Sequence, residues 1–412
     1  MQIPVGGELL MQTDAAGVLE GIVEATENRL RDLCAISSES GNAAGIRRVA
    51  DFLTAGLERH GLRVEVVDEP DANGRPQPVL IARGPSAGEH HLLLLGHMDT
   101  VLPAIEPQLD GRKLLATGAF DMKGGLAMLL GALDVLAARG QHLPADLLVV
   151  LVPDEESEGF ISGQATSRWS RDARAVLVLE PGQASGEGET LVAGRRGLTE
   201  WKLEIAGRAA HSGLAYWTGR SALAAAASWC ARAQGLSSRG TGPTVNVGRL
   251  VGGGADFVHD LARHHDMLGT SRQLNVVSDL AVAEGEFRFL TAGEGESMLA
   301  ELTRLTEEVA ARHEVSATFT PGTHVAPVDP HGPGAPLVQR TVELAAKRGF
   351  PLEVEEDRGG ISFPNFIADP AKTPVVDGLG PTGEGMHIRG EFLNLDSLGR
   401  RVILLADLLA TL

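Results

Sequence analysis

A group of carboxylates follows an apolar segment in the middle of the chain. Residues 147–152, LLVVLV, are all apolar, and four carboxylates follow within five positions: Asp154, Glu155, Glu156 and Glu158. Neighbouring like charges repel one another, so this grouping is not expected on grounds of stability. Cations placed between the carboxylates remove that repulsion. The segment therefore predicts a cation site, with Asp154 and Glu158 interpreted as charges in the first turn of the following helix.

Other side chains that bind metals occupy equivalent places in the chain. Each stands at or shortly after the end of a predicted strand: His97 and Asp99 after 91–96, Glu155 and Glu156 after 147–152, Glu180 at the end of 175–180, and His387 beyond 373–380. Asp121 stands at the head of a helix predicted over 122–140, where it also suits the N-cap. In open α/β sheets, ligands bind outside the carboxyl ends of the strands.

Imidazoles and carboxylates are donors that suit divalent zinc, cobalt or manganese. One ion cannot easily use five such groups, but two ions that share a bridging carboxylate can. If Glu156 binds a metal ion, its neighbour Glu155 points elsewhere and is free to move protons. A hydrolase that uses two metal ions needs such a base to activate its water.

The elements that position these residues follow an α/β pattern. Short apolar strands alternate with helices up to about residue 194, which predicts a mostly parallel sheet. Residues 195–322 have the order β-α-β-β-α-β, which predicts a ferredoxin-like α+β domain. The α/β pattern resumes over 323–412. We therefore expect a catalytic domain built from 1–194 and 323–412 and interrupted by a second domain.

Composition excludes several classes of partner. The net charge of the 412 residues is −18 and no long basic run occurs, which argues against nucleic acid and against an anionic membrane surface. No secretory signal or membrane-spanning stretch is recognised. Cys34 and Cys230 are the only cysteines, so no disulfide framework is expected. These features predict a cytoplasmic protein.

Several motifs, taken in order, resemble one enzyme family. They are GHMDTV, GAFDMKGG, PDEESEG, LEPG, GRAAHSG and GEGMHIRGE, spread over about residues 20–412. Their order and spacing resemble the M20 metallopeptidases, which include glutamate carboxypeptidases, desuccinylases, deacetylases and aminoacylases. The resemblance implies an α/β domain with two metal ions, and an inserted lid domain through which the protein forms a homodimer.

The resemblance also implies a role for individual residues. It assigns five metal ligands, of which Asp121 bridges the two ions: His97, Asp121, Glu156, Glu180 and His387. Asp99 corresponds to the carboxylate that orients His97, and Glu155 corresponds to the general base. Zinc is the expected metal, with cobalt and manganese as alternatives.

In the predicted lid, His211 corresponds to a histidine that reaches the active site of the partner subunit and polarises the scissile carbonyl. Four further residues correspond to substrate contacts: Asn275, Arg288, Gly360 and Ser362. Arg288 is expected to bind a substrate carboxylate through two hydrogen bonds. Tyr216 and Trp217 follow the AHSG motif, where the family usually has proline and acidic residues, and they predict a more aromatic pocket.

Residues 255–273 form an insertion relative to the family. This segment carries His259, His264 and His265. We interpret it as a solvated helix rather than as a third metal site.

These observations predict a two-metal hydrolase that cleaves an amide bond in a small substrate with a free carboxylate. Carboxypeptidases and N-acyl-amino-acid deacylases use the same machinery, so both remain open. Two alternatives are an aminohydrolase that releases ammonia from an aromatic amine, and a catalytically silent binding protein stabilised by metal. The presence of Glu155 argues against the second alternative, because a binding protein has no need for an unligated carboxylate beside the metals.

Overall fold

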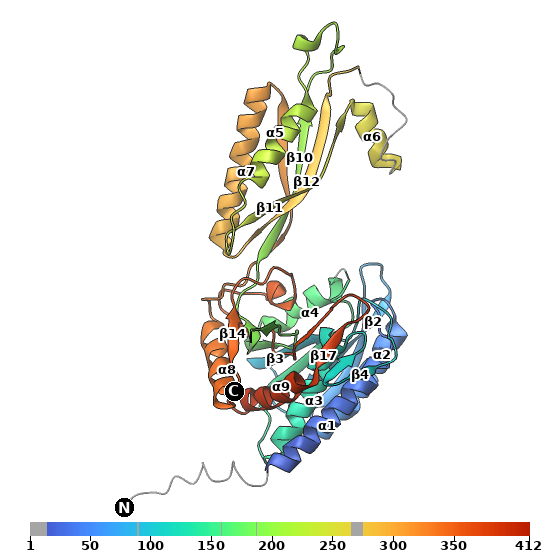
Figure 1. The fold of residues 1–412 in the computed structure, drawn as a ribbon, viewed down its shortest axis with the longest axis vertical. Coiled ribbons are helices and arrows are strands. Elements are labelled where there is room, and N and C mark those ends of the chain that lie inside the picture. The colour runs from blue at the N-terminus through green and yellow to red at the C-terminus, as the bar shows by residue number, and fades with distance from the viewer. Residues whose placement is uncertain (1–14, 89, 158, 187, 265–274) are drawn as a thin grey trace, which may run out of the picture. The chain divides into compact units, whose positions relative to one another are not determined.

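The computed structural model describes residues 15–88, 90–157, 159–186, 188–264 and 275–412 (Figure 1). The chain divides into two compact units. Unit 1 comprises Met1–Ala193, Pro330–Glu356 and Ser362–Leu412, and unit 2 comprises Gly194–Asp329 and Asp357–Ile361. Each unit has its own hydrophobic core.

The largest sheet of unit 1 has the strand order β1-β2-β6-β3-β7-β15. From β6 to β15 neighbouring strands are parallel, whereas β2 and β1 extend the sheet in antiparallel pairings. The strands are β1 (Arg63–Pro70), β2 (Pro76–Arg83), β3 (His91–His97), β6 (Leu147–Val152), β7 (Ala173–Val178) and β15 (Val375–Val376). Every residue of β3 and β6 is buried, which explains why β6 is a continuous apolar run and why β3 is apolar between its terminal histidines, His91 and His97.

Helices surround this sheet. In Figure 1, α4 is drawn above the strands of unit 1, and α1, α3 and α9 are drawn below them. The helices are α1 (Ala15–Cys34), α2 (Ala43–Arg59), α3 (Gly124–Ala138), α4 (Phe160–Ser170), α8 (Ala335–Lys347) and α9 (Leu395–Leu409). α3 is apolar on nearly every side because it packs against both α1 and α9.

Two small sheets complete unit 1. One has the order β14-β9-β8, and the other has the order β16-β17-β5-β4. Their strands are β4 (Gln108–Asp110), β5 (Lys113–Leu115), β8 (Ala184–Ser185), β9 (Gly188–Val192), β14 (Leu352–Glu355), β16 (Gly383–Glu384) and β17 (Phe392–Asn394). The β16-β17 hairpin presents the segment around His387, and β17 pairs with β5 just before the segment that carries Asp121.

Unit 2 is an antiparallel sheet covered by helices. Its strand order is β11-β12-β10-β13. The elements are β10 (Gly197–Ala206), α5 (Ala222–Gln234), β11 (Thr244–Gly253), α6 (Ala255–His264), β12 (Leu280–Phe289), α7 (Ala292–His313) and β13 (Ser316–Val325). The rings of Trp201, Trp229 and Phe319 pack against one another in unit 2, and Trp229 donates a hydrogen bond to Thr306.

Within the described part of the chain, no helix is both long enough and apolar enough to cross a membrane.

A buried ion pair fixes the C-terminal helix of unit 1. Arg401 on α9 is fully buried, and its Nε lies 2.6 Å from a carboxylate oxygen of Glu189 on β9. Its other nitrogens donate to the carbonyls of Gly378 and Thr190. Burial acts to raise the pKa of Glu189, but the charges of Arg401 and Arg400 outweigh it, so the pKa is lowered.

Substitution of Arg401 by Met should destabilise the protein far more than substitution of Arg400. Arg400 pairs with the same carboxylate, but its side chain is 39% exposed, against 0% for Arg401. Breaking a buried pair costs about 3–5 kcal/mol, whereas an exposed pair contributes about 1 kcal/mol or less. Chemical unfolding at neutral pH measures both costs.

The same pair should make stability depend on pH. The folded pKa of Glu189 is lowered, so the pair stabilises the protein above the unfolded pKa, about 4.3, and this contribution is lost as the pH falls through the folded pKa. The difference between wild type and Arg401→Met should therefore shrink in acid. A difference that stays constant with pH would show that Arg401 acts through packing alone.

Candidate active site

The carboxyl ends of three neighbouring strands bring the predicted ligands together. β3 lies between β6 and β7 and is parallel to both. β3 ends at His97, β6 ends two residues before Asp154, and β7 ends two residues before Glu180. Because parallel strands end at the same edge of a sheet, His97, Glu155 and Glu180 meet there.

Asp121 lies between two imidazoles. Its Oδ1 is 3.2 Å from Nε2 of His97, and its Oδ2 is 3.5 Å from Nε2 of His387. Each histidine has a second carboxylate beside it: Glu180 Oε1 lies 3.8 Å from His97 Nε2, and Glu156 Oε2 lies 2.9 Å from His387 Nε2. The site therefore has two halves, His97 with Glu180 and His387 with Glu156, and each half faces one oxygen of Asp121.

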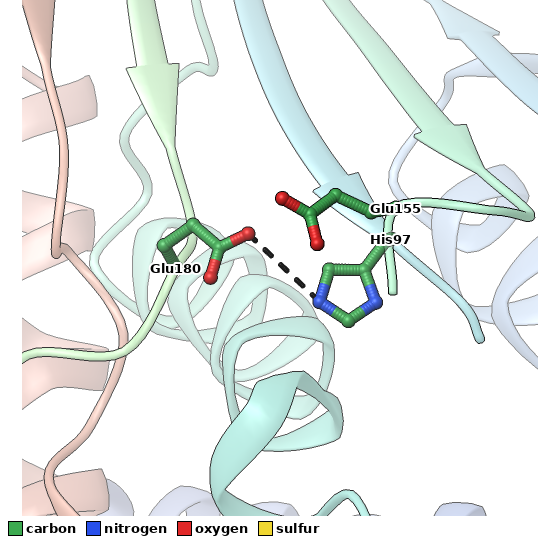
Figure 2. Close-up of side chains that lie close together, drawn as sticks. All are labelled: His97, Glu155 and Glu180. Atoms are coloured by element: carbon green, nitrogen blue, oxygen red, sulfur yellow. Dashed lines mark ion pairs between the residues drawn. The ribbon is translucent and has the colours of Figure 1, made fainter. Parts of the chain in front are cut away.

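Glu155 enters the same cluster from the loop that follows β6. Figure 2 shows Glu155 and Glu180 near the His97 imidazole, with their carboxylates toward it. In the group of His97, Glu155 and Glu180, each residue has one ligand atom within 4.8 Å of those of the other two. The same is true of a second group, His97, Asp121 and Glu156. Adjacent residues in the sequence thus supply carboxylates to both groups.

Asp99 holds both His97 and the loop of the two glutamates. The Nδ1 atom of His97 lies 3.0 Å from the carbonyl oxygen of Asp99 and 3.3 Å from its Oδ1. The Asp99 carboxylate also accepts hydrogen bonds from the backbone N–H groups of Glu155 and Glu156 and from the hydroxyl of Ser40. With Nδ1 engaged in this way, Nε2 of His97 is the nitrogen that faces the carboxylates.

The structure corrects the N-cap interpretation of Asp121. The helix α3 begins at Gly124, and its N-cap residue is Lys123. Asp121 instead lies within the turn η2 (Ala119–Lys123), where its backbone is not helical (φ −120°, ψ 100°). The side chain of Asp121 is therefore directed to the histidines rather than to the amide groups of the helix. The interpretation of Asp154 as a charge in the first turn of the helix is also wrong, because α4 begins at Phe160; the Asp154 carboxylate instead accepts hydrogen bonds from the N–H groups of Ile161 and Ser162. Glu158 lies outside the described residues.

Glycine at the start of α3 allows a close approach to a neighbouring strand. A Cβ atom on Gly125 would lie 2.4 Å from the carbonyl oxygen of Leu179, the residue before Glu180. A side chain at this position would displace the segment that carries Glu180.

Burial perturbs the titration of these side chains. It raises the pKa of Glu155, and together with the charge of Asp121 it raises the pKa of Glu156 to about 10. Burial acts in the opposite direction on His97, but hydrogen bonds to Asp121 and Asp99 leave its pKa well above the usual value. A hydrogen bond to Asp121 raises the pKa of His387. Gathering these anions in a buried place is unfavourable without cations, and the donor set of imidazoles and carboxylates fits divalent metal ions.

A further carboxylate beside the cluster has no predicted role. Glu391 stands four residues after His387, inside the GEGMHIRGE motif, and is 5% exposed. Its carboxylate accepts three backbone hydrogen bonds, from Gly118, Phe120 and Asp121. The position of Glu391 in the same motif as His387 could have drawn attention to it, but the sequence does not reveal which groups its carboxylate contacts.

Other predicted site residues lie in unit 2. His211 is exposed, and its Nδ1 accepts hydrogen bonds from the N–H groups of Gly213 and Leu214. Asn275 lies beside this loop, because its carbonyl accepts a hydrogen bond from Ser212. The structure therefore brings His211 and Asn275 together within unit 2.

Arg288 contacts the glycine-rich segment within unit 2. Its Nε lies 2.8 Å from Glu286 Oε1 and its Nη2 lies 3.2 Å from Glu286 Oε2, while Nη1 donates to the carbonyl of Gly359. The next residue, Gly360, is exposed, and its carbonyl accepts a hydrogen bond from Arg195.

Ser362 lies in unit 1 and contacts a predicted ligand. It is 4% exposed, and its hydroxyl lies 3.2 Å from Glu180 Oε1. Its backbone N–H donates to the side chain of Asn365. In this arrangement the Ser362 hydroxyl is engaged with the candidate metal site, and its predicted contact with substrate stays a prediction.

The insertion around residue 260 is partly helical. α6 carries His259, which is exposed. The side chain of His264 and the whole of His265 lie outside the described residues. Tyr216 and Trp217, which follow the His211 loop, pack edge to face with their ring centres 5.1 Å apart, and both side chains are exposed.

Comparison with known proteins decides the family. Residues 93–411 match the model of peptidase family M20/M25/M40. This range includes all the candidate residues described above. The chain belongs to this family. It is therefore a hydrolase of a metal-dependent peptidase family, as the motifs predict.

Individual M20 proteins resemble the chain over most of its length. Carboxypeptidase G2 of a Pseudomonas species is 26% identical over 391 residues, covering 93% of this chain and 88% of that protein. The crystal structure of aminopeptidase PepT from Bacillus cereus superposes with a TM-score of 0.74 at 23% identity, covering 94% of this chain and 98% of that one.

A third relative is described as a metal-binding peptidase. The YXEP protein of Bacillus subtilis, a dinuclear metal binding peptidase of the M20 family, has a TM-score of 0.65 and 18% identity, with coverage of 95% and 98%. These structural likenesses confirm a mixed α/β fold with several sheets.

Proposed function

We propose that this M20 protein binds two divalent metal ions and hydrolyses an amide bond in a small substrate that carries a carboxylate. The observation that carries the proposal is the position of Asp121, whose two carboxylate oxygens face different histidines. His97 and Glu180 would hold one ion, and His387 and Glu156 the other, with Asp121 between them. Zinc is the expected metal, and cobalt or manganese fits the same donors.

The residues of the site divide the work of hydrolysis. Bound metal ions supply Lewis acidity and lower the pKa of water. Glu155 takes a proton from the attacking water and returns it to the leaving amine, and burial, which raises its pKa above the ordinary value of glutamate, makes it a stronger base. Asp99 fixes the orientation of His97 and of the loop that carries Glu155. Ser362 restrains Glu180 through its hydroxyl group.

Two proposed lid residues complete the substrate site. The Nδ1 atom of His211 accepts hydrogen bonds, so the neutral imidazole carries its hydrogen on Nε2. This N–H group can donate a hydrogen bond to a developing oxyanion. Arg288 is proposed to bind the substrate carboxylate. Its guanidinium is oriented by Glu286 and adjoins the glycine-rich segment.

The proposed roles of the metal site and of the lid residues imply two domains and a dimer. We propose a catalytic domain of residues 1–194 and 323–412 and a lid of residues 195–322 through which two copies pair. Exposed apolar side chains beside His211 support the pairing: Leu214 and Trp217 are each 87% exposed. We also propose that the protein is located in the reducing cytoplasm. Its two cysteines, Cys34 and Cys230, are free and buried, which agrees with that location.

Arg288→Ala should weaken the use of substrates that have a free carboxylate. Loss of a hydrogen bond to a charged group costs about 1.5–3 kcal/mol, which corresponds to about 10- to 150-fold in kcat/KM, mainly through KM. Arg249→Ala is the matched control, because Arg249 pairs with Glu284 on the same strand as Glu286 and is highly exposed. Steady-state kinetics with acid and amidated forms of one substrate measure the effect. An equal loss for both forms would make Arg288 a structural residue.

The substrate class is tested by product analysis. The metal-loaded protein is incubated with N-acyl amino acids, dipeptides and aromatic amines, and the products are identified by mass spectrometry. Release of an amino acid from the first two classes supports the proposal. Release of ammonia without an amino acid would instead favour an aminohydrolase. No turnover of any class with metal bound would favour a binding protein.

A further inference from the structure

We infer that Glu391 is a positioning residue that sets the distance between Asp121 and His387, and that the half-site of His387 and Glu156 depends on it for metal affinity. This inference rests on the proposed metal site. Glu391 has no predicted part in ligation, and its carboxylate makes contacts with the backbone next to a ligand rather than with the ligand cluster.

The contacts of Glu391 fix the segment that leads to Asp121. Its Oε2 lies 2.7 Å from the nitrogen of Gly118, and its Oε1 lies 2.9 Å and 3.0 Å from the nitrogens of Phe120 and Asp121. These three groups surround a turn in which Asp121 has non-helical dihedral angles. A carboxylate that accepts three N–H groups satisfies backbone donors that the turn leaves without helical partners.

Glu391 also belongs to the segment that presents His387. The backbone N–H of Glu391 donates to the carbonyl of Ile388, and the N–H of Ile388 donates to Gly385, which closes the chain around His387. His387 has a positive φ of 67°, a conformation that is unfavourable for a residue with a side chain and that its surroundings must maintain. The carbonyl of Glu391 accepts the N–H of Ala116 as well.

One residue therefore joins two segments that are distant in sequence and that both supply ligands. The backbone of Glu391 shapes the turn of His387, and its side chain holds the backbone of Asp121. The glycine at 118 is part of this arrangement, because a Cβ there would lie 2.4 Å from a methyl carbon of Thr100. A change in the length or hydrogen-bonding of the side chain should move Asp121 relative to His387.

The two halves of the metal site are not equally supported. His97 ends a buried strand and is oriented by Asp99, and Glu180 follows a neighbouring strand. His387 lies on a turn, and its side chain is 49% exposed. Loss of the Glu391 contacts should therefore weaken the His387 half-site more than the His97 half-site.

Glu391→Gln tests the inference, because the amide keeps the size of the side chain but turns one N–H₂ group toward backbone donors. We expect about 10- to 100-fold weaker binding of the more weakly held metal ion, as for other residues that support ligands. Metal content measured by mass spectrometry should fall from two ions toward one at limiting Zn²⁺. Chelator competition gives the two affinities, and Co²⁺ absorption reports the altered ligand geometry.

Matched variants separate positioning from folding. Glu384→Gln changes an exposed carboxylate on β16 and should leave both metal affinities within about two-fold, well below the effect expected of a supporting residue. Glu391→Asp, whose shorter side chain cannot reach all three N–H groups, should reproduce the loss if Glu391→Gln does not fold. Thermal unfolding after chelation shows whether each variant is folded before metal is added.

The possible results distinguish this inference from the proposed function. If the wild-type protein binds two ions and the folded Glu391 variants bind them with the same affinities and the same Co²⁺ spectrum, the positioning role is wrong and the metal site stands. If the wild-type protein binds no divalent ion, both proposals fall. Loss of both ions with equal weakening would also contradict the unequal support inferred here.

Discussion

The Glu155→Gln variant is expected to turn over substrate about 10²- to 10⁴-fold more slowly than the wild type while it keeps its metal ions. Glutamine has nearly the size of glutamate but cannot accept a proton from water. The backbone N–H of residue 155 still donates to Asp99, so the loop geometry should be preserved. Steady-state turnover and metal content, measured on the same preparation, check the prediction.

Glu156→Gln is the matched control for this prediction. Glu156 is the next residue of the same loop, its N–H also donates to Asp99, and its carboxylate lies 2.9 Å from Nε2 of His387. Its substitution should reduce metal content and turnover together, because an amide is a weaker ligand than a carboxylate. Near-normal turnover of a metal-loaded Glu155→Gln variant would remove Glu155 from the role of general base.

The central part of the fold follows from simple sequence patterns. The apolar run 147–152 matches β6 residue for residue, and the predicted strand 91–96 is β3 without its last residue, His97. Buried parallel strands are apolar on both faces, so their limits are visible in the sequence. The alternation of strands and helices then places their carboxyl ends at one edge.

Other elements have no comparable pattern. The strand β2 begins with Pro76 and contains Pro78, which are unusual in a strand, and it joins the sheet through antiparallel pairing with β1 and β6. The strands β15 and β16 have two residues each, too few to show alternation. Asp121 was expected to begin a helix, but hydrogen bonds from its segment to Glu391 hold it in an irregular turn.

The candidate site shows the same division. His97, the last residue of β3, could be predicted because the end of this apolar strand is recognisable, and Glu180 could be predicted although β7 ends at Val178, two residues before the predicted limit. The role of Glu391 could not, because it depends on contacts with residues about 270 positions earlier in the chain. Any residue type except proline can supply a backbone N–H group, so the sequence does not show which residues donate to Glu391.

Complementation between two inactive chains is the second large effect that we expect. His211→Ala and Glu155→Ala should each be nearly inactive alone, because one removes the proposed oxyanion donor and the other removes the base. If His211 serves the active site of the partner subunit, a mixed dimer has one site with an intact Glu155 from one chain and an intact His211 from the other. Its second site lacks both.

Equal amounts of the two variants, exchanged to equilibrium, should regain activity. Random pairing makes half of the dimers mixed, and half of the sites in a mixed dimer are complete, so activity should approach about a quarter of that of the wild type. Size-exclusion chromatography and native mass spectrometry verify that mixed dimers form. Mixed dimers without recovered activity would show that His211 acts within its own chain or takes no part in catalysis, and a monomeric protein would exclude the pairing altogether.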